Sequence, residues 1–148
     1  MRADQVYVDP SALARLYVHQ AGSREMAAWR TKTQGTLAVT HHGRTEIVNA
    51  ICRVSFLGHL DADGLAEALG DLAGDFATGR LRLADLLWRA ALDRAEELSR
   101  VHTPKLGTRA LDVLHVACAL ELKLRGFLTL EARQQALAGA VGFRLVQV

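Results

Sequence analysis

The sequence predicts an α/β fold: a three-layer α/β/α sandwich with a central parallel sheet of about five strands. Short apolar, β-prone segments alternate along the chain with longer segments whose apolar residues recur at helical spacing. Strands that alternate with helices form parallel sheets with helices on both faces. The 148 residues match the size of one domain, and no repeat, low-complexity stretch or linker divides them. We therefore expect a single domain over residues 1–148.

The first half of the chain begins with the apolar run Val6-Tyr7-Val8, which stops at Asp9-Pro10. Asp at an N-cap followed by Pro at the first helical position predicts a helix start. Further along, Ile47, Ile51 and Val54 form an apolar stripe at helical spacing. We expect strands over residues 6–8 and 36–40, and helices over residues 11–18, 23–33, 44–57 and 61–78.

In the second half, glycines and one proline punctuate the pattern. Gly79 and Gly126 each follow a helical segment, and Thr108 is a reasonable N-cap for the helix after it. We expect strands over residues 81–83, 127–130 and 143–146, helices over residues 85–100, 108–124 and 132–140, and a loop over residues 102–107.

Composition limits the functional classes only loosely. The formal net charge of +2 neither establishes nor excludes nucleic-acid binding, although many of the 18 basic residues are Arg, which suits phosphate contacts. Cys52 and Cys118 lie in apolar helical segments without zinc-ligand spacing, which favours buried thiols in a reducing compartment. We find no signal-peptide pattern and no uncharged run of membrane-spanning length. We therefore expect a cytoplasmic protein with no membrane partner.

Four acidic residues are placed where a parallel sheet presents its ligand crevice. Asp9 ends the first strand and Glu131 follows the strand over residues 127–130, so both face the carboxyl edge of the sheet. Glu46 and Asp112 lie in the first turns of helices that start near the same edge. Carboxylate oxygens bind Mg²⁺ and Mn²⁺, and a bound ion activates water and stabilises charge on a transferring phosphate.

Each acid also has a purely structural interpretation. Asp9 suits an N-cap, and Glu46 suits a first-turn acid that complements the helix dipole. Asp112 lies among residues expected to be buried, so it needs a partner, and Arg109 at i,i+3 spacing is one. Glu131 alone is an ordinary polar residue at a strand end.

The histidines favour structural roles. His115 follows Asp112 by three residues on the same side of the helix, and a packed, hydrogen-bonded histidine explains it better than a metal ligand or base. His41 and His42 precede Glu46, where a loop or helix start explains them better than a metal role.

The segments around the four acids carry a recognisable pattern. Asp9 ends a strand and is followed by Pro-Ser-Ala-Leu, and Glu46 lies in Arg-Thr-Glu-Ile-Val-Asn-Ala. Asp112 lies in Thr-Arg-Ala-Leu-Asp-Val-Leu-His-Val-Ala, the most specific stretch, and Glu131 follows Phe-Leu-Thr-Leu. In order and spacing these segments resemble those of PIN domains of the VapC type, and the resemblance spans residues 6–146.

The resemblance implies an activity and a set of ligands. PIN domains of this type cleave RNA with Mg²⁺ or Mn²⁺ and leave a 5′-phosphate and a 3′-hydroxyl. The matched positions imply metal ligation by Asp9, Glu46, Asp112 and, less directly, Glu131, because the family usually has Asp at the fourth position. Ser11 and Thr129 match positions that often hold a hydroxyl near the metal.

Four arginines are candidates for contacts with RNA phosphates. Arg15, Arg53 and Arg133 are near the acidic segments in sequence, and Arg109 either contacts phosphate or orients Asp112. Surface solubility is the alternative role for each.

Three functional hypotheses follow. The first, from the resemblance, is a toxin endoribonuclease that forms a homodimer, is restrained by a VapB-like antitoxin and meets DNA only through that antitoxin. The second is a catalytically weak or inactive PIN fold that binds RNA or a protein partner. The third is a doubly wound domain for a small molecule, which the lack of a Gly-rich loop after the first strand argues against.

Overall fold

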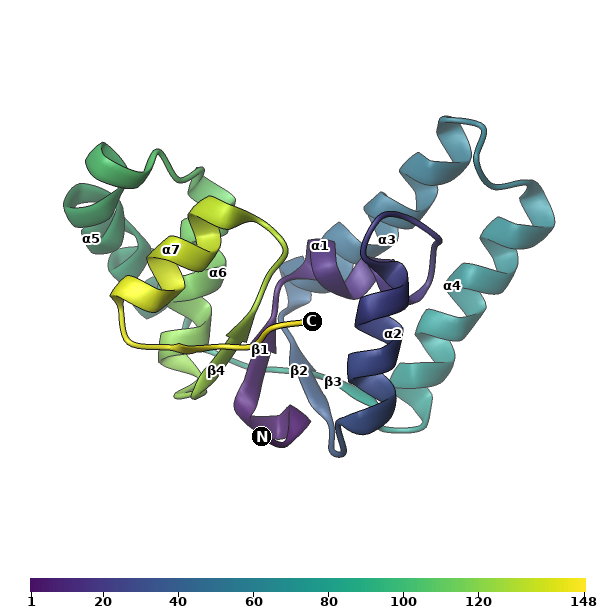
Figure 1. Ribbon diagram of the computed structural model, residues 1–148, viewed down its shortest axis with the longest axis horizontal. Helices are drawn as coiled ribbons and strands as arrows, with labels where there is room; N and C mark the ends of the chain where they lie inside the picture. Colours follow the sequence, from purple (N-terminus) through teal and green to yellow (C-terminus); the bar gives the residue numbers. More distant parts are fainter.

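The computed structural model describes residues 1–148 and has short parallel strands at its centre, flanked by helices (Figure 1). Helices α5, α6 and α7 lie on one side of the strands, and α2, α3 and α4 lie on the other (Figure 1). The helices are α1 (Pro10–Leu13), α2 (Ser23–Lys32), α3 (His41–Phe56), α4 (Ala62–Ala77), α5 (Trp88–Leu106), α6 (Ala110–Glu121) and α7 (Ala132–Ala140); the strands are β1 (Val6–Val8), β2 (Leu37–Val39), β3 (Leu81–Leu83), β4 (Gly126–Leu128) and β5 (Arg144–Leu145).

The strands form two hydrogen-bonded sheets. One has three strands in the order β1-β4-β5, the other pairs β2 with β3, and every pairing is parallel. All five predicted strands are present, but the predicted single five-stranded sheet is not observed. Strand β2 runs beside β1 (Figure 1), yet no backbone ladder joins them. Apolar periodicity predicts where a strand lies, whereas the partner that shares its hydrogen bonds depends on tertiary approach.

Two apolar cores cover opposite faces of the strands. Val6 and Val8 pack into a cluster formed with α1, α2, α3 and α4, while Tyr7 packs into a second cluster with α5, α6 and α7. Successive strand residues point to opposite faces, so this alternation follows from the β conformation. Leu128 and Phe127 of β4 divide in the same way. Helices therefore bury both faces, as the sequence predicts.

The N-terminal helices differ in length from the prediction. The helix expected over residues 11–18 is α1, which ends at Leu13 and continues as a 3-10 turn over Ala14–Leu16. Helix α3 begins three residues before the predicted Arg44, because the Thr40 hydroxyl accepts a hydrogen bond from the backbone N–H of Gly43 and caps it.

The loop predicted over residues 102–107 is wrong, because α5 continues to Leu106. Pro104 lies in its last turn, where the missing N–H removes one hydrogen bond without ending the helix. Gly107, in the left-handed conformation at φ 65°, ends it. The N-cap of α6 is Arg109 rather than the predicted Thr108, whose hydroxyl pairs with that of Thr103. None of the helices combines the length and the apolar character needed to cross a bilayer.

Candidate functional site

Four acidic side chains from distant parts of the sequence line one open cavity of about 360 Å³: Asp9, Glu46, Asp112 and Glu131. Asp9 follows β1, and its N–H donates to the carbonyl of Leu128, which locks it to the end of β4. Asp112 projects from the first turn of α6, as predicted, whereas Glu46 lies in the second turn of α3, because that helix begins at His41 rather than at Arg44. The cavity is also lined by Ser11 and by residues 109–111.

Asp9 is the most buried of the four acids, with 4% exposure. Its Oδ2 accepts hydrogen bonds from the backbone N–H and the hydroxyl of Ser11, so the carboxylate caps α1. Its Oδ1 accepts a bond of 2.9 Å from Nε2 of Gln134. The N-cap interpretation is therefore correct, and the same carboxylate also faces the cavity.

Gln134 is a site residue that sequence reasoning missed. It is fully buried in the first turn of α7, and its Nε2 also donates to the main-chain carbonyl of Asp112 at 3.2 Å. One amide therefore joins the end of β1 to the start of α6. The only signal in the sequence is that Gln134 lies three residues after the strand-end acid Glu131. This spacing does not indicate a site residue unless the contact with Asp9 is known.

Glu46 is oriented by a buried chain of hydrogen bonds. Its two carboxylate oxygens lie 3.0 and 3.1 Å from Nε2 of His115, whose Nδ1 lies 2.6 Å from the Tyr7 hydroxyl. Burial raises the pKa of Tyr7 well above its usual value, so the phenol stays protonated. A carboxylate only accepts, so Nε2 carries the proton of the neutral ring and the phenol donates to Nδ1. His115 is 1% exposed, which confirms the packed, hydrogen-bonded role predicted for it.

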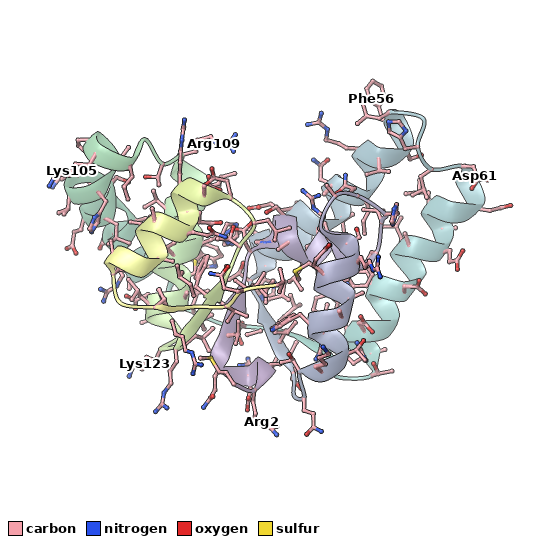
Figure 2. The ribbon with its side chains drawn as sticks, in the orientation of Figure 1. Arg2, Phe56, Asp61, Lys105, Arg109 and Lys123 are labelled. Atoms are coloured by element: carbon pink, nitrogen blue, oxygen red, sulfur yellow. The ribbon has the colours of Figure 1, made fainter.

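The carboxyl group of Asp112 is held in an unfavourable field. Burial, and then the negative charge of Asp9, raise its pKa above the usual value. Arg109, with Nε 3.6 Å from Oδ2, opposes this shift, and the contact is the i,i+3 ion pair considered from the sequence. Its effect is small because 79% of the Arg109 side chain is exposed. Figure 2 shows Arg109 pointing outward from the start of α6.

Glu131 serves as the N-cap of α7 while it lines the cavity. Its Oε2 accepts a 2.7 Å bond from the backbone N–H of Gln134. The hydroxyl of Thr129 accepts from the N–H of Glu131 at 3.2 Å and is buried outside the cavity lining. Of the two hydroxyl residues that the resemblance indicates, the structure therefore places Ser11 in the cavity and uses Thr129 to shape the chain before Glu131.

His42 lies beside this network although the sequence favoured a plain helix start for it. Its ring stacks on that of His115, with centroids 4.6 Å apart, and meets the edge of Trp88 at 4.7 Å. Neither ring nitrogen has a hydrogen-bond partner, and both are shielded from solvent. Burial, and then His115, lower the pKa of His42 to about 4. The ring is therefore neutral at pH 7.

The arginines other than Arg109 lie outside the cavity lining. The guanidinium of Arg15 bonds the carbonyls of Ser11 and Ala21, and that of Arg133 bonds the carbonyl of Gly107. Arg53 is exposed on α3. Their roles in RNA binding stay predictions.

The cavity thus offers oxygen ligands, and the imidazoles of His42 and His115 lie next to Glu46 but outside the cavity lining. His42, Glu46 and His115 form a cluster that could hold a metal ion, with ligand atoms all within 4.8 Å of one another. No protein-family model matches the chain, and no curated protein matches its sequence.

Proposed function

We propose that this chain is a Mg²⁺- or Mn²⁺-dependent endoribonuclease with a PIN-like three-layer arrangement, acting as the toxin of a toxin–antitoxin pair. The observation that carries the proposal is the meeting of Asp9, Glu46, Asp112 and Glu131 around one cavity. They are separated by up to 122 residues in the chain, and the ends of parallel strands are where α/β folds bind ligands.

The donor chemistry fits a hard divalent cation. The side chains in the cavity lining offer mainly carboxylate and hydroxyl oxygens, the ligands that Mg²⁺ and Mn²⁺ take. Burial, and then the negative charge of Asp9, raise the pKa of Asp112, and a bound cation would favour the charged form of this carboxyl group. When bound, the cation would neutralise charge on a phosphodiester and lower the pKa of an attacking water.

The protein's own residues hold the ligands in place. Gln134 and Ser11 fix the rotamer of Asp9, and the Tyr7–His115 pair fixes that of Glu46. Ligands that are already hydrogen-bonded lose little entropy on binding, and such supporting contacts tune metal affinity. Arg109, exposed at the rim, supplies positive charge where an RNA phosphate would approach.

Toxin activity and RNA as substrate rest on the resemblance of the four acidic segments to PIN domains of the VapC type. A VapB-like antitoxin and a homodimer are the partners that this resemblance implies. We infer cytoplasmic action, because RNA and antitoxin meet there.

One observation favours the alternative, a PIN fold that binds RNA or a protein without cutting it. Oε2 of Glu131 already accepts a hydrogen bond that caps α7, and the side chain is one methylene longer than the Asp usual at that position. If the fourth ligand contributes too little, cleavage is lost while the fold and the groove are kept.

The test is cleavage of total RNA by the purified protein with Mg²⁺ or Mn²⁺, with EDTA as a control. Asp112→Asn removes one charge from the cavity at nearly constant shape. Asp71→Asn, at an exposed position on α4, is the matched control for the same chemical change. We expect wild type and Asp71→Asn to cut, and neither Asp112→Asn nor the EDTA sample to do so.

Equal cutting by wild type and Asp112→Asn would overturn the nuclease proposal and identify the activity as a contaminant. Metal-dependent RNA binding without cutting by the wild type would replace it with the non-catalytic alternative. Growth arrest on expression that Asp112→Asn abolishes would support the toxin role.

A further inference from the structure

His42, Glu46 and His115 are brought together by two facing helices. His42 and Glu46 are four residues apart on one face of α3, and His115 comes from α6. One ligand atom from each lies within 4.8 Å of the other two. This set adjoins the oxygen-lined cavity through Glu46, but neither histidine is among the residues that line that cavity.

The unusual feature of the cluster is the imidazole of His42. Both of its nitrogens are shielded from solvent and have no hydrogen-bond partner. An imidazole always carries at least one N–H donor, and most buried polar groups find a partner. The ring is also fixed on both sides by aromatic contacts with His115 and Trp88. The unused nitrogens of this ring, beside a carboxylate and a second imidazole, are the observation that points to a ligand here.

We propose that His42, Glu46 and His115 form a second metal subsite, which takes a borderline divalent cation such as Zn²⁺. Two imidazoles and one carboxylate are a ligand set that zinc uses with one position left open, whereas Mg²⁺ favours oxygen. Bonds of 2.0–2.1 Å in a tetrahedron place ligand atoms about 3.3 Å apart. Nε2 of His115 and the Glu46 oxygens are already 3.0 and 3.1 Å apart. The three ligand atoms lie within 4.8 Å of one another, so binding of an ion would turn the His42 ring out of its stack on His115.

Metal-binding histidines normally form a hydrogen bond through the ring nitrogen that does not bind the metal, and Tyr7 provides this partner for His115. With a cation at Nε2, Nδ1 of His115 carries the proton and faces the Tyr7 oxygen at 2.6 Å. A hydrogen bond from the second ring nitrogen fixes the orientation of a ligating histidine. The subsite shares Glu46 with the proposed Mg²⁺ centre, but it is defined by its own nitrogen ligands and its test needs no RNA.

The experiment is a titration of the metal-free, full-length protein with Zn²⁺ by isothermal calorimetry, repeated in buffer that contains Mg²⁺ because the two sites share Glu46. Co²⁺ is titrated in parallel, with visible absorption and Trp88 fluorescence as readouts, because the Trp88 ring lies 4.7 Å from His42. We expect one Zn²⁺ per chain at this site, and quenching of Trp88 by Co²⁺. His42→Gln should weaken Zn²⁺ binding at least about 10-fold, the size of effect that even outer-contact variants give.

His41→Gln is the matched control, since His41 is the neighbouring histidine and its side chain is 57% exposed. It should bind Zn²⁺ as the wild type does. Asp112→Asn should also keep Zn²⁺ binding while losing RNA cleavage. The zinc subsite and the nuclease activity can therefore be refuted independently of each other. Thermal unfolding of each variant establishes that it is folded.

X-ray absorption of the Zn²⁺-loaded wild type tests the ligands without any substitution. Two imidazoles in the coordination shell support the subsite. A shell without imidazole, or equal Zn²⁺ affinity in wild type and His42→Gln, overturns it.

Discussion

Replacing Gln134 by Leu tests whether one buried amide supports the site. The substitution keeps the approximate volume of the side chain and removes its two donated hydrogen bonds. One goes to Oδ1 of Asp9 at 2.9 Å and the other to the carbonyl of Asp112 at 3.2 Å. Because Asp9 is only 4% exposed, water cannot readily replace the lost donor.

The expected loss in free energy of unfolding is the cost of the two lost hydrogen bonds, reduced by the removal of one buried oxygen that has no partner. Leaving the Asp9 carboxylate short of a donor costs about 1–3 kcal/mol, and losing the bond to the Asp112 carbonyl costs about 0.5–1.5 kcal/mol. Oε1 of Gln134 is itself buried without a partner, so removing it returns part of this cost. The net loss is about 2–3 kcal/mol in free energy of unfolding, which in a chain of this size lowers Tm by roughly 4–12 °C.

Urea and thermal unfolding in EDTA measure this loss. Gln134→Glu is the sharper variant, because it replaces the donating amide with a carboxylate facing Asp9 and adds like-charge repulsion. Gln135→Glu makes the same chemical change at the neighbouring, half-buried position. We expect Gln134→Glu to be destabilised more than Gln135→Glu at neutral pH, and the difference to shrink in acid or when Mg²⁺ is added.

A change of less than about 0.5 kcal/mol for Gln134→Leu, the range of ordinary surface substitutions, would refute the reasoning. So would equal stability of Gln134→Glu and Gln135→Glu. Either result would mean that the Asp9 carboxylate does not depend on the Gln134 amide.

Three further outcomes are expected. The folded-state pKa of Asp112 is raised, so the stability it contributes is complete below its unfolded value near 3.8 and is lost as the pH rises through the folded pKa. In EDTA, Asp112→Asn should therefore gain stability over the wild type from acid to neutral pH; parallel urea curves at all pH values would contradict this. Tyr7→Phe leaves Nδ1 of His115 buried without its donor and should cost about 1–3 kcal/mol in urea unfolding, whereas an unchanged midpoint would show that the bond contributes nothing. Mg²⁺ at a hundredfold over its Kd should stabilise the wild type by about 2.7 kcal/mol, and thermal unfolding of Asp112→Asn should show little of this gain; equal gains would place the ion elsewhere.

Local patterns in the sequence were sufficient to predict most elements. Hydrophobic alternation and helical periodicity depend only on neighbouring residues, so all five strands and the helices between them were expected near their observed positions. The boundaries failed where local signals conflict with packing. Pro104 looks like a loop residue in sequence, yet α5 packs along α6 and runs through it. The division into two sheets depends on which strands approach closely enough to bond.

The sequence by itself determined the acidic residues at strand ends and helix starts, because position in a parallel α/β fold follows from element order. Only the tertiary structure decided which side chains form hydrogen bonds with these acidic residues. Gln134 reaches Asp9 across 125 residues, and His115 reaches Glu46 across 69. The His42 ring has no hydrogen-bond partner, because it is enclosed between Trp88 of α5 and His115 of α6. Such contacts join side chains from separate elements. They depend on how those elements pack against one another, which a local sequence pattern does not predict.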